Sequence, residues 1–220
     1  MRSLVLLSLI LCFSAQARLE KGFVYCSDWV KPLKVELRYL TPDNFVGGPV
    51  DGYQANRCIM TKPAAKALAT VASELEPYGL GLKVFDAYRP QKAVNHFVRW
   101  ARALEKTEMK WKYYPREPKT DLFSKGYIAD KSGHSRGSTL DLTLIDLHTG
   151  NELDMGSGWD FFGKESWPSY TALTPEQRAH RLLLRRFMMD AGFKPYEQEW
   201  WHFTLDKEPY PKDYFDFDVE

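Results

Sequence analysis

The chain has 220 residues with 30 basic and 29 acidic side chains, and 44% of its residues are hydrophobic. This length is sufficient for one domain with its own core. The near-zero net charge excludes a strongly basic nucleic-acid-binding protein, because binding to phosphate depends on clustered excess cations.

The first seventeen residues have the layout of a secretory signal peptide. Arg2 supplies a positive start, residues 4–13 form an apolar run, and Ala15 and Ala17 are small residues at a cleavage site. The run is too short to span a bilayer. The alternative to a signal peptide is a frayed apolar terminus or a buried strand. We expect cleavage after Ala17, a periplasmic or secreted domain of residues 18–220, and no stable membrane association.

Two cysteines remain after such processing, Cys26 and Cys58. In an oxidising compartment they could form one disulfide, and closing that loop would stabilise the domain by roughly 3–4 kcal/mol. Two buried thiols are the alternative, because the sequence does not specify the distance between them.

Strands and helices are interspersed along the first half of the mature chain. Residues 35–39 alternate apolar and charged side chains, which is typical of a half-buried strand. Thr61 is placed to cap a helix with Pro63 in its first turn, and Gly79 ends that helix. Residues 82–87 then read as a buried strand.

The second half continues this pattern. An apolar stripe predicts a helix over residues 94–104, and residues 105–131 form a long loop of the kind that is often functional. Residues 138–145 alternate like a strand, and a capping box at residues 174–177 opens a helix that ends at Gly192. The last predicted strands are residues 193–196 and 200–205. This order predicts a single α+β domain with a central antiparallel sheet flanked by helices.

Two of the five histidines, His134 and His202, have an acidic companion at the spacing of metal ligands. His134 lies in a flexible stretch that enters the strand carrying Asp141, whose side chain points away from the leucine face. Glu199 and His202 flank two tryptophans, and this apolar setting would raise the pKa of a carboxyl group towards the range of a general base. Because an ideal strand would turn Glu199 and His202 to opposite sides, we expect the strand to begin after Glu199 or to bulge.

Each motif alone has a simpler interpretation: a hydrogen-bonded His–Asp pair, or an aromatic core edge with an incidental histidine. Together they offer two imidazoles and one carboxylate, and catalytic zinc commonly has three protein ligands with an open fourth position. Glu199 would remain to deprotonate a water molecule whose pKa the metal lowers to about 7. Arg89, on a turn after a strand, could stabilise the oxyanion formed on attack.

Three motifs carry a family resemblance: Ser132-x-His134-x-x-Gly137-x-x-x-Asp141, Glu199-x-Trp201-His202, and Tyr88-Arg89-Pro90. They resemble the VanX-type D-alanyl-D-alanine dipeptidases, which belong to a wider group of zinc peptidases that includes lysostaphin-like enzymes and D-Ala-D-Ala carboxypeptidases. Further similarities, such as Met155-Gly156-Ser157 and Pro209-Tyr210-Pro211, extend the resemblance over essentially the whole mature chain.

The resemblance implies hydrolysis of D-Ala-D-Ala to two D-alanines with one zinc ion per chain. The implied zinc ligands are His134, Asp141 and His202. The implied general base is Glu199, and Arg89 would support the transition state. A small closed substrate pocket would be lined by Asp160, Tyr39, Tyr53 and Ser132.

Asp160 is our candidate for the partner of the substrate's ammonium group, although it could merely cap its own loop. The predicted export signal differs from the vancomycin-resistance members, which act in the cytoplasm, and favours scavenging or recycling of wall dipeptide. Two other functions stay open. One is a D,D- or L,D-carboxypeptidase that trims longer peptidoglycan peptides. The other is a non-catalytic zinc-bearing binding module, for which the spare carboxylate of Glu199 would have no use.

Overall fold

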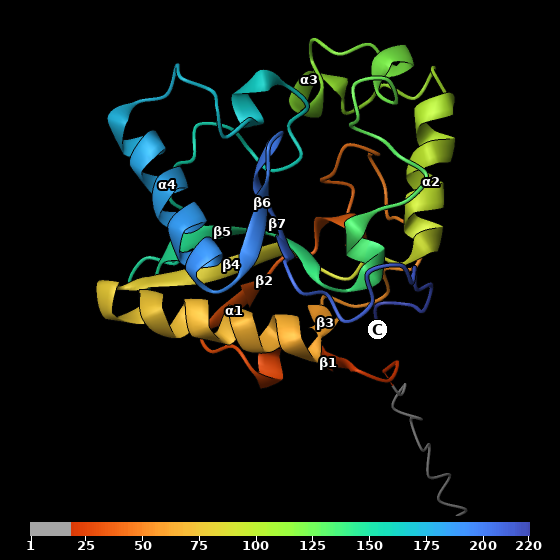
Figure 1. Cartoon of the computed structure of the whole chain (residues 1–220). Helices are drawn as coiled ribbons and strands as arrows, with labels where there is room; N and C mark the ends of the chain where they lie inside the picture. The colour runs from red at the N-terminus through yellow and green to blue at the C-terminus, as the bar shows by residue number, and fades with distance from the viewer. Residues whose placement is uncertain (1–18) are drawn as a thin grey trace, which may run out of the picture.

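The computed structural model describes residues 19–220, and the predicted signal peptide lies outside this range (Figure 1). The α-helices within it are α1 (Lys62–Leu75), α2 (Gln91–Arg102), α3 (Lys110–Tyr113) and α4 (Pro175–Asp190). The strands are β1 (Phe23–Tyr25), β2 (Leu33–Val35), β3 (Ile59–Thr61), β4 (Leu80–Asp86), β5 (Thr139–Asp146), β6 (Phe193–Tyr196) and β7 (Glu199–Leu205). None of the described helices is long and apolar enough to cross a membrane.

The main sheet has five strands in the order β2-β4-β5-β7-β6, and β1 and β3 form a separate antiparallel pair. The single α+β domain is therefore confirmed, but the expectation of a purely antiparallel sheet is wrong at one edge. β2 runs parallel to β4, because the connection between them contains β3 and α1 and returns the chain in the same direction. The other pairs of this sheet are antiparallel.

The strand predicted over residues 35–39 is displaced. β2 ends at Val35, and a 3₁₀ helix follows over Arg38–Leu40. The backbone leaves the sheet after Glu36, whose N–H donates to the Val84 carbonyl, and the next N–H, of Leu37, donates to the Asn56 side chain instead. The alternating pattern of side chains therefore continues past the point where the strand pairing stops.

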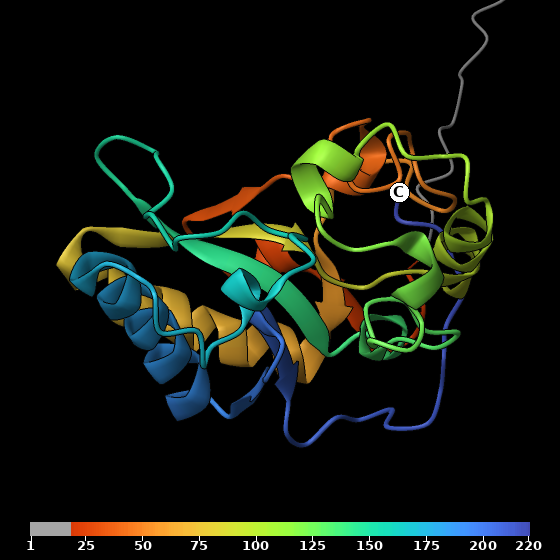
Figure 2. The same cartoon turned by 90° about the horizontal axis from the view of Figure 1, so that it is seen from above.

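Helices α1 and α4 lie side by side over one face of the sheet (Figures 1 and 2). The predicted capping box of α4 is present: the Thr174 hydroxyl accepts from Gln177 N–H at 3.2 Å, and the Gln177 side chain accepts from Thr174 N–H at 3.0 Å. Thr61 precedes α1 as predicted but does not cap it through its side chain. Its hydroxyl contacts that of Ser138 at 2.7 Å, which ties α1 to the start of β5.

Helix α2 and the long segment between α2 and β5, which contains α3, lie beyond the end of the sheet that is farther from α4 (Figure 2). An aromatic cluster fills the space beneath them, with Phe45 contacting Phe97, Trp100 and Phe162 at ring-centroid distances of 4.8–5.1 Å. Leu104, which was expected on the buried stripe of α2, lies past the helix end and is 53% exposed. The other residues of the predicted apolar face are buried, apart from Val98, which is partly buried.

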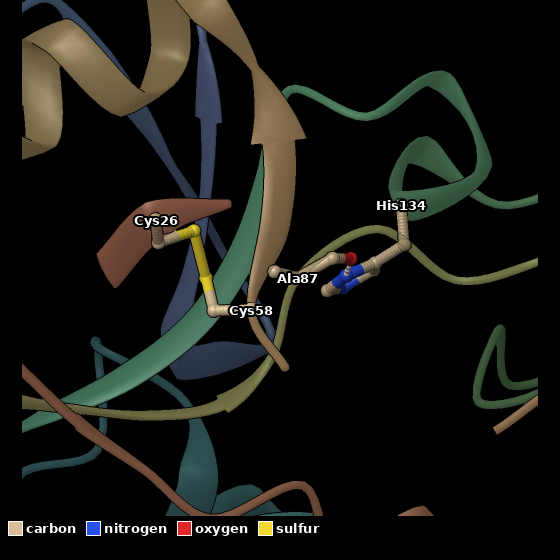
Figure 3. The surroundings of a disulfide bond; sticks show 4 residues. All are labelled: Cys26, Cys58, Ala87 and His134. Atoms are coloured by element: carbon tan, nitrogen blue, oxygen red, sulfur yellow. Dashed lines mark hydrogen bonds between the residues drawn. A yellow bond between two sulfur atoms is a disulfide. The ribbon is translucent and has the colours of Figure 1, made fainter. Parts of the chain in front are cut away.

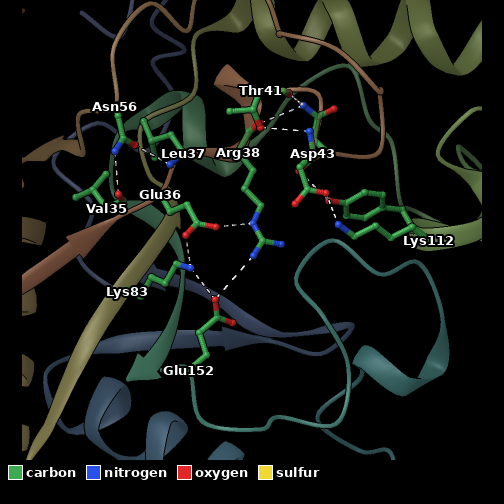
Figure 4. A network of polar contacts seen from close by, with 12 residues as sticks. Val35, Glu36, Leu37, Arg38, Thr41, Asp43, Asn56, Lys83, Lys112 and Glu152 are labelled. Atoms are coloured by element: carbon green, nitrogen blue, oxygen red, sulfur yellow. Dashed lines mark hydrogen bonds and ion pairs between the residues drawn. The ribbon is translucent and has the colours of Figure 1, made fainter. Parts of the chain in front are cut away.

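A network of charged side chains holds the segment that leads from β2 to Tyr39 (Figure 4). Lys83 of β4 is only 4% exposed and pairs with Glu36 and, at 2.6 Å, with Glu152. Glu36 also accepts from Arg38 Nε at 3.0 Å, and the guanidinium of Arg38 lies over the ring of Phe85. Because two partners hold Arg38, the neighbouring Tyr39 is held in place at the edge of the site.

Candidate active site

Strand register brings the candidate ligands together. In β4, β5 and β7, Asp86 lies opposite Asp141, and Asp141 lies opposite His202. Directly paired residues of neighbouring strands project to the same face of a sheet. The sequence places Asp141 on the polar face of β5, and in the structure this side chain is buried, with an exposed fraction of 2%.

His134 completes the group from a 3₁₀ turn over Gly133–Arg136, immediately before β5. Its Nε2 lies 3.3 Å from Asp141 Oδ1 and 3.3 Å from His202 Nδ1, and the third edge, from His202 Nδ1 to Asp141 Oδ1, is 3.1 Å. Three side chains from two distant parts of the sequence therefore form a compact triangle that could hold a metal ion.

The hydrogen bonds at this triangle show that it suits a cation. His134 Nδ1 lies 2.7 Å from the Ala87 carbonyl, which can only accept, so Nδ1 carries the proton and Nε2 is left with a lone pair (Figure 3). That lone pair faces Asp141 Oδ1, a buried oxygen that accepts no hydrogen bond from the described residues. Two acceptors facing each other in a buried site repel unless a cation lies between them.

The edge lengths match a particular class of ion. Ligand atoms at 2.0–2.2 Å from a tetrahedral zinc ion lie roughly 3.3–3.6 Å from one another. The observed edges of 3.1–3.3 Å are close to this range. Two imidazoles and one carboxylate are also ligand types that zinc accepts. The residues present therefore fit a zinc ion.

Glu199 lies beside the triangle without belonging to it. Its Oε2 is 3.3 Å from His202 Nδ1, and it is not one of the three residues that form the cluster. β7 begins at Glu199, and the pairing of β6 with β7 shifts register between Pro195 and Tyr196. This irregularity corresponds to the bulge expected from the sequence, and it lets Glu199 and His202 face the same cavity.

The two acidic neighbours dominate the electrostatics of His202. Burial alone lowers the pKa of its imidazole, but the adjacent carboxylates of Asp141 and Glu199 outweigh burial and raise that pKa to about 9. Positive charge is therefore favoured at this position.

Arg89 is fixed by a carboxylate that sequence reasoning did not identify. Its Nε donates to Asp86 Oδ2 at 2.9 Å, and the other oxygen of Asp86 accepts from Tyr53 Oη at 2.6 Å. The guanidinium stacks over the rings of Tyr39 and Phe97, and Nη2 lies 3.8 Å from Asp141 Oδ2. Arg89 therefore has little freedom to move where it lines the cavity.

Asp160 reaches the cavity from a different loop. Tyr39 Oη donates to Asp160 Oδ2 at 2.6 Å. Burial and the nearby Asp141 carboxylate raise the pKa of Asp160 well above its usual value, against the effect of Tyr39 and Arg89. Its backbone has φ 58°, a left-handed conformation that non-glycine residues adopt rarely and that often marks a functional position.

The remaining predicted pocket residues differ in position. Ser132 lines the cavity, and its hydroxyl accepts from His134 N–H at 3.3 Å, which braces the turn that carries the histidine. Tyr53 turns its hydroxyl onto Asp86, behind the residues that line the cavity. Asp86 is the last residue of the buried strand β4 and stands three residues before Arg89, and that spacing was the one signal in the sequence that could have identified it.

The cavity that these side chains share has a volume of about 260 Å³. Pockets that bind drug-sized molecules are larger, at roughly 300–1,000 Å³. Carboxylates of Asp141, Asp160 and Glu199 line it together with Arg89 and Lys131. The arrangement suits a small ligand that carries charge at both ends.

Known proteins resemble the chain along its whole described length. A family model described as D-ala-D-ala dipeptidase matches residues 19–220. A D-alanyl-D-alanine dipeptidase of Enterococcus faecium is 42% identical over 202 residues, covering 92% of this chain and 100% of that protein. One of Streptomyces coelicolor is 42% identical over 197 residues, covering 90% and 98%. One of Escherichia coli is 38% identical over 176 residues, covering 79% of each.

A solved structure of a mutant of the vancomycin resistance D,D-pentapeptidase VanY, in complex with Zn(II), is a remote structural neighbour. It is 15% identical with a TM-score of 0.43, and the match covers 70% of this chain and 77% of that one. The sequence matches are much closer. With a family model that spans every described residue and relatives above 40% identity across nearly their full length, this chain belongs to the D-Ala-D-Ala dipeptidase family.

Proposed function

We propose that this protein hydrolyses D-alanyl-D-alanine to two D-alanines, with one zinc ion held by His134, Asp141 and His202. The observation that carries the proposal is the convergence of this triangle with Glu199 and Asp160 on one cavity of about 260 Å³. Membership of the family supports it. When bound, zinc supplies a Lewis acid that polarises a carbonyl group and increases the acidity of water.

Glu199 acts as the general base. Its carboxylate removes a proton from the attacking water molecule, and the water oxygen forms a bond to the carbonyl carbon of the dipeptide. The bond from that carbon to the amide nitrogen then breaks, and Glu199 returns the proton to the departing amine. The products are two D-alanine molecules, and Glu199 is regenerated.

Arg89 and Asp160 act on the charges of the reaction and the substrate. The Arg89 guanidinium, held by Asp86 at 2.9 Å, stabilises negative charge that develops on the carbonyl oxygen. The Asp160 carboxylate pairs with the free ammonium group of the dipeptide, with Tyr39 orienting it. This pairing gives the buried Asp160 carboxylate a cationic partner in addition to the Tyr39 hydroxyl, so the free amino terminus becomes a requirement for binding.

The proposed location is the periplasm or the cell exterior, where the enzyme would recycle or scavenge wall dipeptide. The signal-like sequence of residues 1–17 supports this location. The disulfide between Cys26 and Cys58 supports it independently (Figure 3), because such bonds persist in oxidising compartments.

The decisive experiment compares D-Ala-D-Ala with its N-acetyl form as substrates of the purified mature protein. We expect hydrolysis of the free dipeptide and a loss of at least 10³-fold in kcat/KM on acetylation, because the Asp160 carboxylate would be left buried without its partner. Comparable turnover of the two would identify a carboxypeptidase instead.

A variant of Glu199 tests its role as the general base. Glu199→Ala should abolish turnover while one zinc ion stays bound, measured by metal analysis after dialysis. Retained activity, or loss of zinc, would contradict the role assigned to Glu199.

A further inference from the structure

We infer that Trp159 is a positioning residue that holds the Asp141 carboxylate in the orientation needed for metal binding; this inference rests on the proposed zinc site. The indole Nε1–H of Trp159 donates to Asp141 Oδ2 at 3.2 Å. Both residues are 2% exposed, so no bulk water competes for the bond.

The two oxygens of Asp141 have different surroundings. Oδ1 faces His134 Nε2 and His202 Nδ1 at 3.3 and 3.1 Å. Oδ2 faces away from this triangle and accepts from Trp159. Among the described residues, Trp159 is the only hydrogen-bond donor to Asp141 Oδ2, because Arg89 Nη2 lies 3.8 Å from that oxygen.

This division has a consequence for coordination. A carboxylate that binds a metal through one oxygen occupies one coordination position, whereas a carboxylate that binds through both occupies two. A hydrogen bond to Oδ2 favours the first mode and leaves a position open, which a catalytic site needs. Without the indole N–H, the Asp141 carboxylate is free to rotate about its side-chain bonds.

The indole is itself firmly packed. It stacks on Phe85 of β4 with ring centroids 5.5 Å apart and meets the Tyr39 ring edge-on at 5.0 Å. The guanidinium of Arg38 lies 6.0 Å from its centroid. The support for Asp141 is therefore anchored to the sheet and to the charged network of Figure 4.

The backbone at Asp160 explains how two neighbouring residues serve one site. Successive side chains of an extended chain point to opposite sides. The left-handed conformation of Asp160, with φ 58°, breaks this alternation. Trp159 can then contact Asp141 while Asp160 accepts from Tyr39, so a single loop supports both the metal ligand and the proposed substrate anchor.

The test uses Trp159→Phe, which removes the N–H donor and keeps an aromatic ring. The control is Trp100→Phe, because Trp100 is also buried and its indole N–H has no partner among the described residues. Zinc affinity of the metal-free proteins is measured by competition with a chromophoric chelator. Cobalt(II) is then substituted for zinc, and its visible absorption reports the coordination number.

We expect Trp159→Phe to bind zinc about 10–100-fold more weakly, as is usual when the hydrogen-bond partner of a metal ligand is lost. Its cobalt spectrum should shift towards higher coordination, whereas Trp100→Phe should match the wild type in both measurements. Equal zinc affinity and an unchanged cobalt spectrum in Trp159→Phe would overturn the inference. Failure of the wild type itself to bind zinc would instead refute the proposed function.

Circular dichroism and urea unfolding of the metal-free proteins establish that both variants are folded. If Trp159→Phe does not fold, the same measurements are made with 3-benzothienylalanine at position 159. That side chain has the shape of indole with sulfur in place of N–H. It should reproduce the loss of zinc affinity if the hydrogen bond is responsible, and wild-type affinity would contradict the inference.

Discussion

Reduction of the disulfide between Cys26 and Cys58 should destabilise the protein by an amount that follows from the fold. The bond joins the segment after β1 to the residue before β3 across a sequence separation of 32. The chain-entropy relation for a loop of that size gives about 3.7 kcal/mol at 25 °C. For a chain of about 200 residues, this corresponds to a decrease in Tm of about 9 °C.

The structure also predicts that the effect reaches the site. Cys58 precedes Ile59, whose carbonyl accepts from Tyr88 N–H at 2.9 Å. Tyr88 follows Ala87, the partner of His134 Nδ1. Figure 3 draws the disulfide together with the Ala87–His134 contact. Reduced protein should therefore bind zinc more weakly than oxidised protein, as well as being less stable.

The assay is urea unfolding of metal-free oxidised and reduced mature protein, followed by circular dichroism, so that a difference in zinc affinity does not contribute to the measured stability. The control is the double variant Cys26→Ser, Cys58→Ser, which should unfold at the same urea concentration with and without reductant. A difference below about 1 kcal/mol between oxidised and reduced wild type, at equal denaturant slopes, would refute the entropic reasoning.

Three further predictions concern single charges. Lys119 Nζ donates to three backbone carbonyls in the last turn of α2 and the segment that follows it, at 2.6–2.9 Å. Lys119→Met should therefore lower the free energy of unfolding by about 2–4 kcal/mol in a urea titration. An unchanged midpoint would contradict this role. Although burial raises it, hydrogen bonds from Lys83 and Arg38 hold the pKa of Glu36 below its ordinary 4.5. The stability contributed by a depressed carboxyl pKa is present above the unfolded value and is lost as pH falls through the folded value. Glu36→Gln should therefore be less stable than wild type at pH 7, and the difference in unfolding free energy should shrink as the pH falls below 4.5; a difference that stays constant down to the acid limit of folding would contradict this. Lys131 lines the cavity, forms no ion pair with a carboxylate among residues 19–220, and has its Nζ 4.8 Å from the ring centroid of Tyr214, so we expect it to bind the substrate's carboxylate group. Lys131→Met should accordingly raise KM for D-Ala-D-Ala about 10-fold and leave KM for the C-terminal amide unchanged, and an equal effect on both would exclude a role in binding the substrate carboxylate.

Most individual elements could be predicted because their signals are local. The capping box of α4 involves Thr174 and Gln177, which are three residues apart, and the alternation of β5 is apparent within eight residues. The residue types of the candidate metal site could also be predicted, because each of two short motifs places a histidine close to a carboxylate in the sequence: His134 with Asp141, and His202 with Glu199. A sequence can specify such features because the interactions behind them span only a few positions.

Tertiary structure alone decided how these pieces meet. The parallel pairing of β2, the burial of Asp141 and the linkage of Asp86 to Tyr53 and Arg89 all depend on residues far apart in the chain. The hydrogen bond from Trp159 to Asp141 depends further on a left-handed backbone at Asp160. Local preference disfavours that conformation in a non-glycine residue, and it persists because the surrounding packing outweighs the cost.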